Sequence, residues 1–138
     1  MSEVARAKRR RVTAAGVNEP GAGLSSNCFV VGEFVIFTGL TARDPDGQPT
    51  ALGDAYGQAV VTFKRMKALI EAAGGTMSDI IKLNCFLTDI RHRDGFVKAR
   101  KEFFTGDFPP CAVIGNVSFT EPELLIEVDG WAILGSGH

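Results

Sequence analysis

Two carboxylates near the end of the chain are the best candidates for chemistry. Between Leu124 and Asp129, apolar residues at 124, 126 and 128 alternate with Leu125, Glu127 and Asp129. Side chains of a strand point alternately to its two faces, so this pattern predicts a β-strand with one apolar face and both carboxylates on the other. A partly buried carboxylate can take up and return protons, so Glu127 is a candidate general acid or base; the alternative is a plain surface residue.

Cys111 is the second candidate, because it follows a Pro109-Pro110 corner some residues before that strand. A thiol attacks a substrate as the thiolate, so Cys111 could be a nucleophile if its surroundings stabilised that form. No histidine is adjacent to it in the sequence. An inert thiol that fills space is therefore the competing interpretation.

Other residue types that usually carry chemistry are scarce. The chain has 3 cysteines at wide spacings and 2 histidines, His92 and His138. This set fits neither a disulfide framework nor a zinc pattern, and it disfavours a histidine metal site or a Ser-His-Asp triad. We therefore expect no metal, and the odd number of cysteines fits a reducing cytoplasm.

The elements that must hold these residues follow a regular order. Apolar β-branched and aromatic runs predict strands, and apolar stripes at steps of three and four predict helices. The predicted elements are strands at 27–31 and 33–38 in a hairpin around Gly32, a helix from an Asp54 N-cap to Gly74-Gly75, a strand within 78–89, a helix at about 94–104, and two strands joined by a short polar turn within 107–132. This order predicts a mixed α+β sheet with two helices on one face.

The strand within 78–89 has one apolar face and one half-polar face. Ile81, Leu83, Cys85 and Leu87 form the apolar set, and Ile80, Lys82, Asn84, Phe86 and Thr88 form the mixed set. The mixed set is too apolar for free solvent and too polar for a core. We therefore expect helices over the first face and another subunit against the second.

Length and composition limit the possible functions. With 138 residues, 45% of them hydrophobic and 22% charged, we expect one domain over residues 1–138, with 1–16 as a flexible basic tail. No apolar run is long enough to span a membrane. The net charge of −1 argues against nucleic acid as a partner, and the run from Lys8 to Arg11 is interpreted as solvated tail.

Several segments are similar to those of one protein family. The run LIEAAGGTMSDIIK at 69–82, followed by CFLTD at 85–89, is similar to the central segment of the RidA (YjgF/YER057c/UK114) family of reactive-intermediate deaminases. Thr38-Gly39 resembles the Ser-Gly at the end of that family's second strand. The pair Phe108-Pro109 and the run 125–129 resemble its proline corner and its closing strand. The likeness extends in order from about Gly23 to Ala132.

The resemblance implies a chorismate-mutase-like α+β fold and a homotrimer with three clefts between subunits. In archetypal members each cleft hydrolyses an imine or enamine to a keto acid and ammonia, and neither a cofactor nor a metal is needed. An arginine after the proline corner binds the substrate carboxylate, and a glutamate on the closing strand handles water or the leaving nitrogen. Glu127 matches that glutamate.

The family arginine has no counterpart in this chain. No Arg follows Arg100, and the corner reads Pro109-Pro110-Cys111-Ala112. Counting from the prolines puts Cys111 at the arginine position, whereas counting back from Glu127 puts Ala112 there, and a bulge would reconcile the two. A charge-assisted pair contributes about 1.5–3 kcal/mol, so its loss disfavours the archetypal route for a small 2-imino acid.

Several further residues complete the candidate binding site. They are Ser25 at the family's aromatic lid position, Thr38 and Gly39 after the second strand, Arg43 in the next loop, Asn84 and Phe86 on the half-polar face, and Ala112, Ile114 and Asn116 on the cleft side of the strand after the corner. Asn116 could bond a neutral carbonyl, and Arg43 could supply a charge or be a solvated loop residue. Gly39 could admit a ligand or another backbone, or could mark a bulge.

Two functions of different classes follow from these expectations. The first is a hydrolytic deaminase of a reactive imine or enamine, or a related hydrolase of a conjugated pathway intermediate, that uses Glu127 and water in clefts between subunits. The second is the same trimer as a non-catalytic binder of a small metabolite. A nucleic-acid role is disfavoured by the mild net charge.

Overall fold

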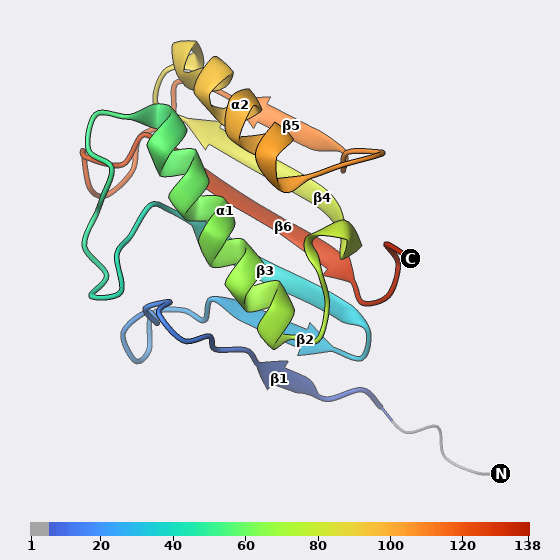
Figure 1. Cartoon of the computed structure of the whole chain (residues 1–138). Coiled ribbons are helices and arrows are strands. Elements are labelled where there is room, and N and C mark those ends of the chain that lie inside the picture. Colours follow the sequence, from blue (N-terminus) through green and yellow to red (C-terminus); the bar gives the residue numbers. More distant parts are fainter. Residues whose placement is uncertain (1–5) are drawn as a thin grey trace, which may run out of the picture.

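The computed structural model describes residues 6–138, which form a six-stranded sheet with two α-helices on one of its faces (Figure 1). The strands lie in the order β1-β2-β3-β6-β4-β5. The elements are β1 (Arg9–Arg11), β2 (Cys28–Val31), β3 (Phe34–Leu40), α1 (Ala55–Ala72), the 3-10 helix η1 (Met77–Asp79), β4 (Ile80–Leu87), the 3-10 helix η2 (Ile90–His92), α2 (Arg93–Phe103), β5 (Cys111–Ile114) and β6 (Ile126–Ile133). This arrangement confirms the expected α+β fold.

The pairing of the strands makes the sheet mixed. Only β4 and β5 run parallel; the other neighbours are antiparallel, including the predicted hairpin of β2 and β3. The prediction of two C-terminal strands joined by a short polar turn is wrong. β4 lies between β5 and β6, so the connection, residues 115–125, has to pass from one side of β4 to the other.

A strand that the sequence pattern does not predict borders β2. Arg9–Arg11 pairs antiparallel with Phe29–Val31, so the predicted flexible tail is wrong for these residues, and residues 1–5 of that tail lie outside the described chain. An edge strand need not bury its side chains, and all three arginines are exposed. Val12, which follows them, is 1% exposed and joins the core. The sequence pattern misses this strand because its side chains are all charged, and its pairing with β2 is made by the backbone.

The two α-helices share an aromatic cluster above the sheet. The Asp54 carboxylate accepts a hydrogen bond from the Gly57 N–H at 2.9 Å, which confirms the predicted N-cap of α1. The ring of Phe63 in α1 is fully buried and packs against the rings of Phe96, Phe103 and Phe104 at centroid distances of 5.4 to 5.7 Å. This packing fixes both helices over the same face. Within residues 6–138, no helix is long and apolar enough to cross a membrane.

β4 shows the predicted alternation with one local change. The odd-numbered residues from Leu83 to Leu87 are fully buried under the helices, and Asn84 and Phe86 are only partly buried on the other face. The register against β6 shifts between Ile80 and Lys82. This irregularity buries Ile80 instead of the predicted Ile81.

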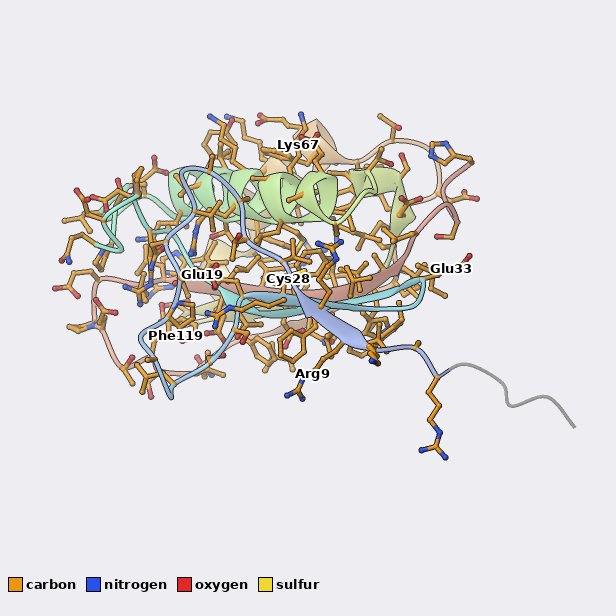
Figure 2. The ribbon with its side chains drawn as sticks, turned by 90° about the horizontal axis from the view of Figure 1, so that it is seen from below. Arg9, Glu19, Cys28, Glu33, Lys67 and Phe119 are labelled. Carbon is orange, nitrogen blue, oxygen red and sulfur yellow. The ribbon has the colours of Figure 1, made fainter. Side chains whose placement is uncertain are left out.

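The second face of the sheet, called here the open face, is covered by no helix of residues 6–138. Figure 2 shows Lys67 on the outer side of α1 and Arg9 on the opposite side of the sheet. The open face carries apolar side chains that are 38–44% exposed, namely Phe34, Ile36, Ile114 and Ile133. So many exposed large apolar groups on one face are typical of a surface that meets another protein.

Candidate active site

β6 turns Glu127 toward the open face. Its neighbours Ile126 and Val128 are fully buried under the helices, so strand alternation directs Glu127 to the other side. Glu127 lies opposite Phe86 in the antiparallel ladder with β4. The predicted apolar and acidic faces of this strand are therefore confirmed.

Gly39 makes room for the Glu127 carboxyl group at the end of β3. A Cβ atom on residue 39 would lie 2.6 Å from Glu127 Cδ and 2.8 and 2.9 Å from the two carboxyl oxygens. Any side chain at this position would therefore displace Glu127. The register of β3 against β6 also shifts between Phe37 and Leu40. The bulge interpretation of Gly39 is thus confirmed, and the group that comes close to its backbone is the Glu127 side chain.

A second carboxylate, that of Asp129, affects the pKa of Glu127. Asp129 shares the open face with Glu127, and Asn84 Nδ2 donates a hydrogen bond to Asp129 Oδ1 at 2.8 Å. Burial raises the pKa of Glu127 above its ordinary value, and the charge of Asp129 raises it further. Glu127 thus titrates nearer to neutral pH than a free glutamate, which suits a group that exchanges protons with a substrate.

A hollow of about 660 Å³ opens beside Glu127. The end of β3 and the loops 18–27, 43–47 and 118–124 form most of its wall. Figure 2 shows Glu19 and Phe119, which belong to two of these loops, at the same end of the molecule. The volume lies in the range of sites that bind small molecules.

The structure divides the predicted binding residues into two groups. Ser25, Thr38, Gly39 and Arg43 line the hollow together with Glu127. The second group, Asn84, Phe86, Ala112 and Ile114, belongs to β4 and β5, on the far side of β6 from β3, and does not line the hollow of the described chain. Asn116 lies outside the hollow as well, exposed in the loop after β5.

Cys111 lies on the helix-covered face of the sheet. It pairs in the parallel ladder with Leu83, which is fully buried, and it packs against the core. Ala112 pairs with Asn84 and so takes the open-face position, which favours Ala112 over Cys111 as the counterpart of the missing arginine. Burial raises the pKa of the Cys111 thiol. Cys111 does not line the hollow of the described chain, and its raised pKa disfavours the thiolate, so these observations favour the inert thiol over the nucleophile.

The sequence analysis misses most residues that line the hollow, among them Glu19, Arg65 and Phe119. Glu19 lies in a turn-rich loop, where it accepts hydrogen bonds from Arg11 at 2.7 Å and from Asn27 at 2.8 Å. Arg65 had a usable signal, because Gln58, Thr62 and Arg65 form a polar stripe at helical spacing and all three are buried. Among residues 6–138, no group of three or more His, Cys, Asp or Glu side chains could hold a metal ion.

Comparisons with known proteins agree with this architecture. The model of a family described as Endoribonuclease L-PSP matches residues 18–134. A 2-iminobutanoate/2-iminopropanoate deaminase of Dermatophagoides farinae is 30% identical over 93 residues, which cover 67% of this chain and 73% of that protein. The crystal structure of a protein of unknown function from Pseudomonas aeruginosa is 36% identical, with a TM-score of 0.82 over 94% of each chain. RidA from an Antarctic Psychrobacter species shares the fold, with 22% identity and a TM-score of 0.80 over 91% of this chain and 99% of that one.

Proposed function

The chain belongs to the endoribonuclease L-PSP family, the RidA/YjgF family, and we propose that it is a hydrolytic deaminase of a reactive imine or enamine. The observation that carries this proposal is Glu127, a partly buried carboxylate with a raised pKa at the wall of a hollow. The deaminase from Dermatophagoides farinae supports the same class of reaction. The alternative, a non-catalytic trimer that binds a small metabolite, uses the same hollow without proton transfer.

Hydrolysis of an imine needs one group that moves protons in both directions. Starting from a protonated imine, the ionised Glu127 takes a proton from water while the water oxygen bonds to the imine carbon, which gives a neutral carbinolamine. Glu127 then returns this proton to the nitrogen, the C–N bond breaks, and the departing ammonia takes the hydroxyl proton. One water enters, a carbonyl compound and an ammonium ion leave, and Glu127 is ionised again.

We also propose that the active form is a cytoplasmic homotrimer. The exposed apolar side chains of the open face support burial against other copies of the chain. Asn84, Phe86, Ala112 and Ile114 lie on that face but away from the hollow, so a neighbouring copy would have to bring them to it. The three cysteines are free, which supports a reducing compartment.

The test is ammonia release from freshly generated 2-iminobutanoate and from a panel of larger conjugated imines. Glu127→Gln keeps the shape of the side chain but removes the base, so we expect kcat to fall about 10²- to 10⁴-fold. Glu33→Gln, in the exposed turn between β2 and β3 (Figure 2), is the matched control and should leave kcat unchanged. If the wild-type protein releases ammonia from none of the imines faster than buffer does, the deaminase proposal is rejected and the non-catalytic binding protein remains.

A further inference from the structure

Two arginines of the hollow have no part in the proposed proton transfers. Arg65 in α1 is only 7% exposed; its Nη1 donates to the Thr41 carbonyl at 2.6 Å and its Nη2 to Asn18 Oδ1 at 2.8 Å. Within residues 6–138, its buried Nε has no hydrogen-bond partner. Arg43 lines the same hollow from the loop after β3. We call Arg43 and Arg65 the arginine pair.

The arginine pair places two like charges close together. The pKa of Arg65 falls to about 10, first because of burial and then because of the positive charge of Arg43. Three acidic residues line the hollow of the described chain. Glu127 is the proposed acid–base group, Glu19 is bound by Arg11 and Asn27, and Asp46 is exposed in its loop. A carboxylate on Arg43, whether that of Glu121 or that of a ligand, therefore offsets the repulsion between the two arginines.

Arg43 is held in place by neutral oxygens and neutralised by one carboxylate. Its Nε donates to Thr41 Oγ1 at 3.1 Å and its Nη1 to the Gly47 carbonyl at 2.8 Å. Its Nη2 forms an ion pair with Glu121, whose side chain is 39% exposed in the loop before β6. The Arg43 side chain is 22% exposed, so Glu121 is the more accessible partner of the pair. An incoming carboxylate offers Arg43 the same charge-assisted bond and can take the place of Glu121, while the other two bonds keep Arg43 oriented.

We propose that Arg43 binds the carboxylate of the substrate in exchange for Glu121. This inference rests on the proposed function. Glu127 acts at the reacting carbon of the substrate, and Arg43 is assigned to the carboxylate at its other end. The guanidinium then comes from the β3 side of Glu127, whereas the open-face positions of β5 hold the uncharged Ala112 and Ile114. The substrate class is a carboxylate-bearing imine or enamine, and uncharged imines bind poorly.

Binding of 2-oxobutanoate and of its methyl ester, followed by calorimetry or NMR, tests this assignment without turnover. Arg43→Gln should weaken binding of the carboxylate about ten- to a hundred-fold and leave the ester unchanged. Glu121→Gln removes the competing carboxylate and should tighten binding of the acid by about two- to five-fold. Arg91→Gln is the matched control, because Arg91 pairs with Asp89 on the surface and does not line the hollow of the described chain.

The inference is overturned if Arg43→Gln binds the acid as tightly as wild type does, or if Glu121→Gln binds it no more tightly. It is also overturned if the wild-type protein binds neither compound, or binds the acid no more tightly than the ester. Its failure can be told from failure of the proposed function. Arginine-dependent binding without any ammonia release would reject only the deaminase. Deaminase activity with the same KM in Arg43→Gln and wild type would reject only the role of Arg43 in binding the substrate. An unchanged thermal midpoint of each variant shows that binding was measured on folded protein.

Discussion

Glu127 and Asp129 are two residues apart on β6 and show how neighbouring carboxylates can take different tasks. Asp129 accepts a hydrogen bond from Asn84, which holds its charge beside Glu127. Glu127 lies instead against the bare backbone of Gly39, where partial burial disfavours its charged form. The charge of Asp129 therefore helps to set the pKa at which Glu127 gains and loses its proton.

Asp129→Asn should lower the pKa of Glu127, because it removes a nearby negative charge while the burial of Glu127 remains. If ionised Glu127 is the base, the acidic limb of the kcat/KM profile then moves to lower pH. A carboxyl ¹³C NMR titration of Glu127 should show the same direction without substrate. Asp107→Asn, at an exposed position between α2 and β5, is the control. A limb that does not move in Asp129→Asn would contradict the coupling.

The sequence predicts residues at this scale only where the governing pattern is local. Alternation along the strand is enough to put Glu127 and Asp129 on one face. The choice between Cys111 and Ala112 depends on how β5 aligns with β4, which is a contact distant in sequence, so local counting left it open. Arg65 was missed because a polar side chain on a helix usually meets solvent.

At the level of elements, Gln58 joins α1 to the connection that enters β6. This fully buried side chain donates from Nε2 to the Glu123 carbonyl at 2.8 Å, and its Oε1 accepts from the Leu125 N–H at 2.8 Å. The same connection carries Glu121, the ion-pair partner of Arg43. A helix residue thus fixes the loop that supplies one wall of the hollow.

Gln58→Leu should destabilise the protein, because it leaves a backbone N–H and a carbonyl without their partner. Each unsatisfied buried group costs about 1–3 kcal/mol, so we expect a loss of roughly 2–4 kcal/mol in the free energy of unfolding. Urea denaturation measures it. Gln48→Leu, at an exposed loop position, should stay within about 0.5 kcal/mol of wild type. Equal stability of the two variants would show that the bridge contributes nothing.

The limits of prediction for elements have physical causes. The caps of α1 and the turn of the first hairpin come from local chemistry and are confirmed. β1 was missed because its exposed arginines carry no apolar pattern and its backbone pairing with β2 is invisible in the sequence. The irregularity between Ile80 and Lys82 was missed because Ile80 and Ile81 are equally apolar.

Considered as a whole, the molecule has one face of the sheet closed by helices (Figure 1). Its other face displays apolar side chains to solvent. Ile36, which is 42% exposed near the middle of β3, lies on the open face. Proteins that function as monomers rarely leave such groups together on one surface. The sequence predicted this face from the half-polar residues of β4, because period-two alternation reports burial on each side of a strand separately.

Ile36→Asp should dissociate the proposed trimer, because a buried, unpaired carboxylate at the interface is costly to desolvate. Light scattering at micromolar concentration should change from the mass of three chains to that of one. Leu52→Asp is the control: Leu52 is 63% exposed in the loop before α1 and should leave the mass unchanged. A wild-type mass of one chain would overturn the trimer.

Glu127 is carried by a strand with neighbours on both sides, whereas most of the hollow's wall consists of surface loops. Loops accept insertions and substitutions that a central strand does not. The loops that would recognise a substrate can therefore change faster in evolution than the strand that carries Glu127. An engineer could transplant the three loops of a relative to change which metabolite is accepted and leave the acid–base machinery as it is.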